Sequence, residues 1–454
     1  MHPLLVLVVS MAAVIGLIVW ARLHAFLALL IGAVLVGVMA PAIPAAEAVT
    51  LAATELGVVA GRVGIIIALA SFIGLGLQHS GGATRIGAFF LNLAGAKRSH
   101  YAMAANGYIL SIPVFFDTVF YLMAPLIRAM HAQAKWGYPL LLMAVVGGAA
   151  ATHVFVPPTP GPLAAATQLN VDLGLMILLG TIVGIGAAIA GLAYASWAFR
   201  HWPNLAARVR AEIENPQAGS DAPVTDGPLP GLFLSLLPIV LPIVLIAGRT
   251  VVTATGAEGP LASFVSFFGD PNVALFLALL ATMYLLVSTR RLTRAELAAL
   301  TEKAFESAGT IILITAAGGA YGGMLTRAEI GTTLADYASA LGLPVLLLAF
   351  LLASLLKIAQ GSSTVAIITS ASIIAGLYAG GDPALLPHPV YAALAAAGGS
   401  LVVSWMNDSG FWVIAKMGGL DNADTIRMWT GTAATVGTAG FLIAVVLSWL
   451  LPLK

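Results

Sequence analysis

The chain has 454 residues, of which 60% are hydrophobic and only 9% are charged, and its formal net charge is +1. A soluble protein carries about 25% charged residues, so this chain cannot cover itself with polar surface in water and is predicted to be a polytopic membrane protein. The net charge gives no basis for nucleic-acid binding, and the lack of cysteine excludes disulfides and thiolate metal sites. No nucleotide-binding loop or His-Glu-x-x-His motif is present, so we expect no cofactor, no metal site and no enzymatic activity.

The apolar stretches predict an all-α protein. The N-terminal stretch Leu4–Trp20 lacks the basic start of a signal peptide and is interpreted as a retained helix. The predicted elements of the first half are spans at 4–20, 25–40 and 60–95, the last of them broken near the glycines at 81–82. A re-entrant hairpin at 101–130, a broken span at 138–170 and a span at 172–199 follow. The second half has spans at 231–249, 273–288 and 304–338, a hairpin at 343–378, a broken span at 388–418 and a span at 427–451. The hairpin arms are too short to cross a bilayer at about 1.5 Å per residue.

The two halves resemble each other. Gly74–Gly87 is similar to Gly318–Gly331 at an offset of 244 residues. Asp117-Thr118-Val119 aligns with Ser363-Thr364-Val365 at an offset of 246, and Gly148 aligns with Gly399 at an offset of 251. The nearly constant offset predicts a first transmembrane repeat at 1–199 and a second at 231–454, joined by a polar linker at 200–230.

Basic residues predict the orientation of the repeats. In the first half the link after span one carries Arg22, whereas the only charged residues of the next link, Pro41–Gly61, are Glu47 and Glu55. In the second half Thr250–Pro271 lacks lysine and arginine, and the following link carries Arg290 and Arg294. Because basic loops stay cytoplasmic, the predicted fold is two inverted-topology repeats with re-entrant hairpins and broken transmembrane helices, and the linker is cytoplasmic.

Four polar breaks interrupt the apolar sequence at equivalent places in the halves: Pro113–Thr118, Pro157–Pro162, Gln360–Thr364 and Asn407–Gly410. Any one of them is explained equally well as a helix kink with locally bonded hydroxyls. Unwound backbone at membrane depth must nevertheless be satisfied by protein or by a water-filled cavity, and the symmetric placement favours an anion site at helix ends. The predicted substrate contacts are Thr118, Thr159, Gly361, Ser362, Ser363, Thr364, Asn407 and Ser409.

Asp117 and Asp408 lie within long apolar stretches, where a charged side chain costs several kcal/mol. They are candidates for carrying a coupled proton, and His153 is a third because histidine titrates near neutral pH. The alternative for the carboxylates is a structural ion pair, for example with Lys357. For His153 the alternative is a hydrogen-bonded packing residue.

At these motifs the chain resembles the gluconate permease family of proton symporters. The matching stretches are Ile73–Gly82, Ile112–Pro125, Thr152–Leu163, Ala359–Ser370 and Ser404–Trp412, and the resemblance covers nearly the whole chain. It implies proton-coupled uptake of gluconate or a related sugar acid or hydroxy acid across a bacterial inner membrane, with a homodimer as a further possibility. The family's site positions fall on Asp117, Thr118, Ser362, Ser363, Thr364, Asn407, Asp408 and Ser409.

Three other functions are possible alternatives to proton symport. Sodium coupling is the nearest alternative in mechanism, because hydroxyl-rich hairpin tips and unwound carbonyls also coordinate Na⁺. A passive channel is disfavoured, because a pore does not need symmetric broken helices around a midplane site. A membrane-embedded enzyme would need a nucleophile–base pair or metal ligands at helical spacing, and the sequence has neither.

Overall fold

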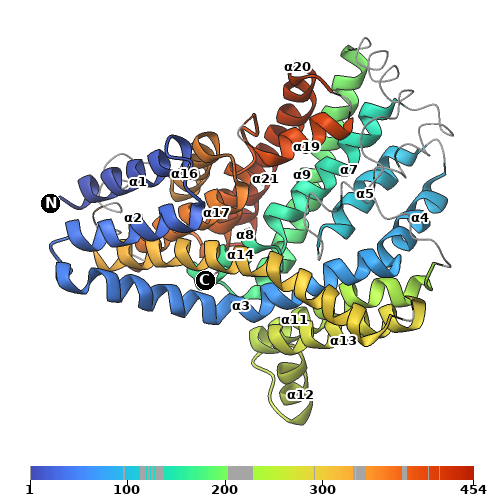
Figure 1. Ribbon diagram of the computed structural model, residues 1–454, viewed down its shortest axis with the longest axis horizontal. Coiled ribbons are helices and arrows are strands. Elements are labelled where there is room, and N and C mark those ends of the chain that lie inside the picture. Colours follow the sequence, from blue (N-terminus) through green and yellow to red (C-terminus); the bar gives the residue numbers. More distant parts are fainter. Residues whose placement is uncertain are drawn as a thin grey trace.

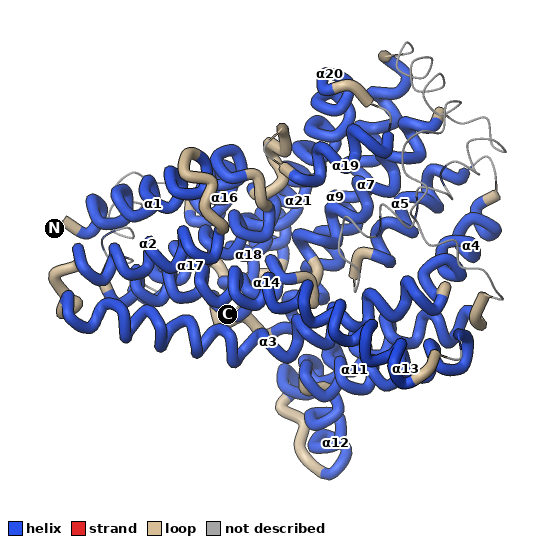
Figure 2. The backbone as a smooth tube through the Cα atoms, viewed as in Figure 1, coloured by secondary structure: helices blue, strands red, loops and turns tan. Residues whose placement is uncertain are grey.

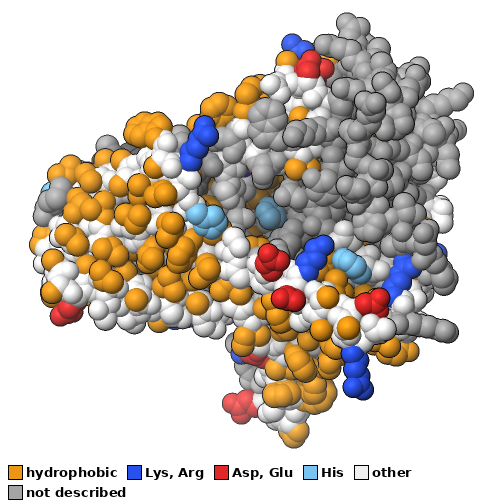
Figure 3. Space-filling model, in the orientation of Figure 1, with side chains coloured by type: hydrophobic (Ala, Val, Ile, Leu, Met, Phe, Trp, Pro, Cys, Tyr) orange, Lys and Arg blue, Asp and Glu red, His pale blue; other side chains and the backbone are white. Residues whose placement is uncertain are grey.

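A computed structural model describes residues 2–95, 98–112, 119, 123, 127, 137–202, 229–290, 292–330, 333, 344–380, 386–406, 408–418 and 420–453. Within these ranges all regular secondary structure is helical (Figures 1 and 2). Seven of the described helices are long and apolar enough to cross a membrane. Figure 3 shows hydrophobic side chains dominating the face over α1, α2 and α3, as expected of a surface in contact with lipid. The predicted all-α polytopic membrane fold is confirmed.

The helices of the first half follow the predicted order. They are α1 (Pro3–Val19), α2 (Ala25–Met39), the short 3₁₀ helix η1 (Ala45–Glu47), α3 (Ala48–Ser80), α4 (Gly82–Ala94), α5 (Ser99–Leu110), α7 (Tyr138–Phe155), α8 (Pro160–Gln168) and α9 (Leu173–His201). The predicted break in the third span lies at Gly81, whose φ of 80° is left-handed and ends α3. The second arm of the first hairpin and nearly all of the linker lie outside the described residues.

The helices of the second half are similar in order. They are α11 (Leu232–Thr255), α12 (Pro260–Phe268), α13 (Pro271–Arg290), α14 (Arg294–Arg327), α16 (Val345–Gln360), α17 (Ser363–Gly380), α18 (Pro389–Gly399), α19 (Ser409–Gly418), α20 (Asn422–Thr425), the π-helical turn η3 (Ile426–Thr430) and α21 (Gly431–Leu450). The second hairpin, α16–α17, and the second broken span, α18–α19, occur where the sequence places them.

Several predicted bounds were wrong. Helix α3 begins at Ala48 rather than near residue 60, so most of the predicted link Pro41–Gly61 is helical. One of the two acidic residues in that stretch, Glu55, is paired with Arg327 of α14 at 2.6 Å, which offsets the cost of its charge within a span. Helix α14 likewise begins at Arg294 rather than 304, because Thr293 and Glu296 form a capping box.

The link predicted between the first two spans of the second half contains a helix. This helix, α12, projects from the body of the molecule (Figure 1) and exposes Leu261, Phe264 and Phe267. Its nine residues lack charge, so composition alone does not separate it from a short apolar link. The ion pair between Arg249 and Asp270, at 2.7 Å, joins the segments on either side of it.

The broken spans occupy the centre of the protein. Every residue of α18 after Pro389 is buried, and so is every residue of α7 except His153. Helices α9 and α21 pack beside them, and α3 and α14 run side by side along one edge of the molecule (Figure 1). The break between α7 and α8 therefore lies within protein rather than against lipid, which is the condition for unwound backbone at membrane depth.

Each half contains an equivalent close contact between two of its own helices. A Cβ on Gly148 of α7 would lie 2.1 Å from the carbonyl oxygen of Ala104 in α5, and a Cβ on Gly399 of α18 would lie 2.1 Å from that of Phe350 in α16. Phe350 follows Ala104 by 246 residues, and Gly399 follows Gly148 by 251 residues. These are the offsets found between the halves of the sequence. Helix α2 also packs on α14 while its counterpart α13 packs on α3. These correspondences support our proposal of repeats at 1–199 and 231–454.

The proposed inversion of the repeats predicts which loops face the cytoplasm. Because the chain has no cysteine, single cysteines can be introduced at Ser220 in the linker, at Arg294, and at Glu258 in the loop before α12. A membrane-impermeant thiol reagent should label the first two only from the cytoplasmic side and the third only from the opposite side. Labelling of Ser220→Cys and Arg294→Cys from different sides would contradict the inversion.

Candidate substrate and coupling site

The second hairpin reverses within two residues. Helix α16 ends at Gln360, and Gly361 follows with a left-handed φ of 84°, which glycine adopts without the steric cost that a Cβ brings. The Ser362 hydroxyl then accepts a hydrogen bond from the Val365 amide at 3.3 Å and caps the start of α17. The Ser363 hydroxyl donates to the carbonyl oxygen of Ser400 at 2.9 Å. The tip is thus fixed against the unwound segment of the second broken span.

The described residues of that unwound segment, 400–406 and 408, are held by hydrogen bonds from neighbouring elements. The Trp429 indole donates to the Ser404 hydroxyl at 2.9 Å, and the Thr430 hydroxyl donates to the Ser404 carbonyl. The Trp405 indole donates to the carbonyl of Ile358 in α16 at 3.1 Å. At the end of the segment, Asp408 accepts the Gly410 amide at 2.9 Å. The Asp408 carboxylate therefore lies at the N-terminus of α19, where the helix dipole stabilises negative charge.

A buried ion pair joins the hairpin to the broken span. The Lys357 ammonium lies 2.8 Å from Oδ2 of Asp408, and the two side chains are only 1% and 13% exposed. The same ammonium donates to the carbonyl oxygen of Gly361 at 2.5 Å, and the Ser404 hydroxyl donates to Oδ2 of Asp408. The structure thus gives Asp408 the ion-pair partner that the sequence offered as an alternative. Removing either charge alone would leave the other buried and unpaired, which is strongly unfavourable.

The first broken span, α7–α8, contacts the tip of the second hairpin at Thr364. Helix α7 ends at Phe155 and α8 begins at Pro160, with a Thr159 hydroxyl that donates to the Val156 carbonyl at 2.6 Å. Nε2 of His153 lies 3.5 Å from the Thr364 hydroxyl of α17. A Cβ on Gly161 would lie 3.7 Å from Cα of Thr364, so the first turns of α8 and α17 are in contact.

Three helix N-termini therefore gather around the hairpin tip: those of α8, α17 and α19. The unsatisfied amides and the dipole at a helix N-terminus attract an anion, and converging half-helices are the usual anion site of transporters built from broken helices. The charges of Lys357 and Asp408 balance each other. The positive field of the N-termini is thus the main attraction for an anionic substrate while both side chains are charged.

The predicted site residues differ in how they are placed. The hydroxyls of Thr159, Ser362 and Ser363 already bond to backbone groups, as the kink interpretation anticipated, whereas Thr364 faces His153. Gly361 contributes its carbonyl to Lys357, and Ser409 is the first residue of α19. Asp117, Thr118 and Asn407 lie outside the described residues.

Sequence reasoning missed three contributors from the second half: Ser400, Ser404 and Trp429. Ser404 precedes Asp408 by four residues, so its proximity in sequence was a usable signal. No local pattern marks Ser400 or Trp429, whose bonds to Ser363 and Ser404 join segments that are distant in sequence.

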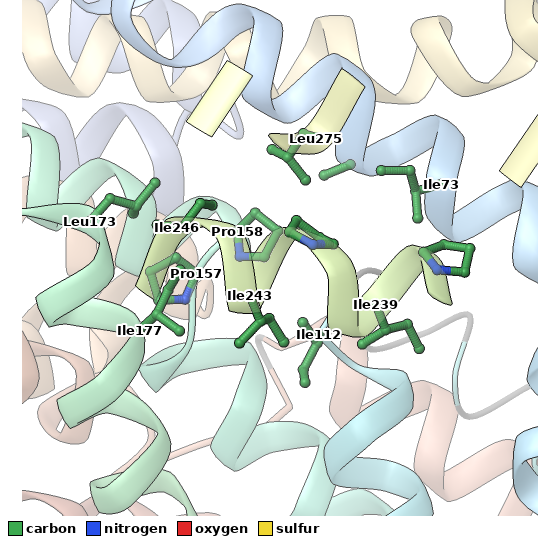
Figure 4. Close-up of a pocket in the computed structure, with 13 residues that line it drawn as sticks. Ile73, Ile112, Pro157, Pro158, Leu173, Ile177, Ile239, Ile243, Ile246 and Leu275 are labelled. Atoms are coloured by element: carbon green, nitrogen blue, oxygen red, sulfur yellow. The ribbon is translucent and has the colours of Figure 1, made fainter. Parts of the chain in front are cut away.

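A separate apolar cavity lies behind the α7–α8 break (Figure 4). Pro157 and Pro158 form one wall, and α3, α9, α11 and α13 supply the others. The full lining is Ala70, Ile73, Ile112, Pro157, Pro158, Leu173, Ile177, Pro238, Ile239, Pro242, Ile243, Ile246 and Leu275. These side chains offer no hydrogen bond, and each substrate hydroxyl buried there without a partner would cost about 1–3 kcal/mol. A hydroxy acid is therefore a poor fit to this cavity.

Thr364→Ala is expected to weaken substrate binding, because Thr364 has the tip hydroxyl that is least engaged by the protein. Leaving a buried substrate group unpaired costs about 1–3 kcal/mol, which corresponds to roughly 5–150-fold in the dissociation constant. Thr364→Ser keeps the hydroxyl and is the matched control. Equal affinities for wild type, Thr364→Ala and Thr364→Ser in a binding titration would place the substrate elsewhere.

Comparison with known proteins agrees with this architecture. A family model described as "GntP family permease" matches residues 2–450. The chain is 33% identical to the inner membrane permease YgbN of Escherichia coli, over 98% of each chain, and 30% identical to the low-affinity gluconate transporter of the same organism, over 96% of each. The solved structure of Neisseria gonorrhoeae MtrF aligns with a TM-score of 0.60 at 15% identity, covering 90% of this chain and 85% of MtrF, which shows a shared fold.

The family match extends over nearly the whole sequence and includes all five motifs on which the resemblance rested. Multi-pass insertion into the inner membrane follows from the apolar helices and from the relatives. The chain belongs to the GntP permease family.

Proposed function

We propose that this protein is a secondary active transporter that takes up gluconate, or a related sugar acid or hydroxy acid, together with protons. The observation that carries the proposal is the junction of the second hairpin tip with both broken spans, where a buried Lys357–Asp408 pair lies beside converging helix N-termini. The similarity to the low-affinity gluconate transporter of Escherichia coli favours the same substrate class.

The junction suits a substrate that has one carboxylate and several hydroxyls. Its carboxylate would accept hydrogen bonds from amides at the start of α17 and from the Gly161 amide of α8, whose neighbours Pro160 and Pro162 have no N–H. Its hydroxyls would bond to Thr364 and to carbonyls of the unwound segments, with Thr118 and Asn407 as further contacts predicted from the sequence. Such a site rejects an analogue that lacks hydroxyls, because the protein's own polar groups would then stay unpaired.

The ion pair suggests how a proton and an anion are coupled. While Asp408 is ionised, its charge cancels that of Lys357. When a proton binds Asp408, the buried Lys357 ammonium is left without a counter-charge, and an anionic substrate can supply one. Binding of the proton and of the anion thus favour each other, which is the requirement for symport. Asp117 and His153 remain alternative carriers of the proton.

Counterflow exchange in proteoliposomes tests the substrate class without any ion gradient. Unlabelled gluconate, other aldonates and glycerate should drive entry of labelled gluconate. Glucose, which lacks the carboxylate, and hexanoate, which lacks the hydroxyls, should not. Exchange driven by hexanoate as well as by gluconate would contradict the polar site and would favour the apolar cavity of Figure 4.

A further inference from the structure

The Lys357 ammonium occupies a site built from oxygen atoms. Nζ lies 2.5 Å from the carbonyl oxygen of Gly361 and 2.8 Å from Oδ2 of Asp408, and the side chain is 1% exposed. The Ser404 hydroxyl is close by, because it bonds to the same carboxylate oxygen. Gly361 terminates α16, so its carbonyl lies at the negative end of that helix dipole. A carboxylate, a helix-terminal carbonyl and a hydroxyl form a set of ligands that suits a small hard cation.

We propose that Lys357 is a tethered cation, which fills a position that would otherwise accept Na⁺ and thereby makes transport independent of sodium. Carbonyls at the C-terminal ends of broken helices and unwound segments are the usual ligands of coupling sodium ions in such transporters. Here a side chain that never leaves the protein supplies the positive charge. The inference concerns the cation of the proposed symport and rests on that function.

The contacts of Lys357 indicate that its ammonium takes the place of a bound cation, and that the side chain does more than fill space in the core. The ammonium is held by a main-chain carbonyl from the hairpin and by a carboxylate from the broken span, and so joins the two elements as a bound ion would. Truncating Lys357 to alanine removes the charge and the stem but leaves every oxygen in place. The Asp408 carboxylate then needs another counter-charge, and Na⁺ is small enough to enter the vacated space.

Two variants distinguish the loss of the Lys357 charge from the opening of space for an ion. Lys357→Ala opens the position, whereas Lys357→Met keeps an unbranched stem of similar length without the ammonium. Thermal unfolding of purified protein is compared in NaCl, KCl and choline chloride at one ionic strength. The pH is held constant so that the charge of His153, which interacts with both Lys357 and Asp408, does not vary between samples.

The unfolding midpoint of Lys357→Ala should rise by about 3 °C when Na⁺ is present at about 100 times its dissociation constant, and neither K⁺ nor choline should reproduce the rise. Wild type and Lys357→Met should not respond. In proteoliposomes, gluconate uptake by Lys357→Ala should be lost without Na⁺ and recovered with it. The proposal is overturned if Na⁺ stabilises Lys357→Ala no more than Lys357→Met, or stabilises wild type equally.

A second variant keeps the test decisive if Lys357→Ala is not recovered folded in sodium-free buffer. The double variant Lys357→Ala/Asp408→Asn has no unpaired buried charge, so it should fold, and Na⁺ should not change its unfolding midpoint. Extraction in Na⁺-containing buffer should yield folded Lys357→Ala. Failure of the double variant to fold would mean that Lys357 acts through packing, which contradicts the proposal. Because unfolding is measured without substrate, a wild type that carries no sugar acid would refute the proposed function and leave this result intact.

Discussion

Asp408→Asn is expected to abolish accumulation of substrate under a proton gradient while counterflow exchange continues. Asparagine mimics the protonated carboxyl and cannot release a proton, so the step that couples transport to the gradient is lost. Exchange does not require that release. The Lys357 ammonium also loses its counter-charge, which costs about 3–5 kcal/mol of stability when one partner of a buried pair is removed. Gluconate should therefore stabilise this variant more than it stabilises wild type.

The control is Asp270→Asn, which makes the same chemical change in an ion pair whose side chains are 39% and 37% exposed. It should leave both accumulation and exchange intact, since exposed pairs contribute little. Uptake, counterflow and the yield of folded protein are measured for each variant. Full accumulation by Asp408→Asn would assign the proton to Asp117 or His153. For Asp117→Asn, a loss of folded protein together with every transport mode would indicate a structural role.

Gly399→Ala is expected to destabilise the protein severely. Its Cβ would lie 2.1 Å from the carbonyl oxygen of Phe350, and backbone cannot move aside as a flexible side chain can. Helices α16 and α18 would have to separate at the place where the hairpin meets the broken span. Overpacking typically costs about 1–3 kcal/mol, and we expect the upper end. The measurement is the unfolding midpoint and the yield of purified protein.

Gly309→Ala in α14 is the matched control, because nothing lies within 4 Å of the Cβ position. There alanine should stabilise the helix slightly, by about 0.5–1 kcal/mol, through its better helix propensity. Gly148→Ala tests the repeat, since its contact with Ala104 corresponds to that of Gly399 with Phe350. If Gly399→Ala and Gly309→Ala are equally stable, the close contact of α16 with α18 is not required.

The hairpin tip was predictable because its signals are local. Gly361 supplies the left-handed turn, Ser362 caps the next helix, and both stand between apolar stretches. The start of α3 was not predictable in the same way. Glu55 looks like a loop residue until it is paired with Arg327, 272 residues later in the chain. A charge within a span is acceptable when a distant partner offsets its cost, and a single sequence does not identify that partner.

The candidate site shows the same limit. Asp408 was expected to matter because a carboxylate at membrane depth is costly, and Lys357 was foreseen as a possible partner. The 2.8 Å contact between them joins residues that are 51 positions apart, so the sequence alone did not reveal the ion pair. The sequence does not indicate which hydroxyls are available to a substrate. Only the fold reveals that the Ser363 hydroxyl bonds to the Ser400 carbonyl while that of Thr364 faces His153.

Proton-driven uptake is the most direct test of the account. Purified wild-type protein is reconstituted into liposomes, and entry of labelled gluconate is followed in sodium-free buffer after an imposed pH gradient, acid outside. Labelled gluconate should accumulate transiently above equilibrium; a protonophore should abolish this accumulation, and added Na⁺ should not change it. Accumulation that requires a Na⁺ gradient and is unaffected by the protonophore would contradict both proton coupling and the role of Lys357 as the resident cation.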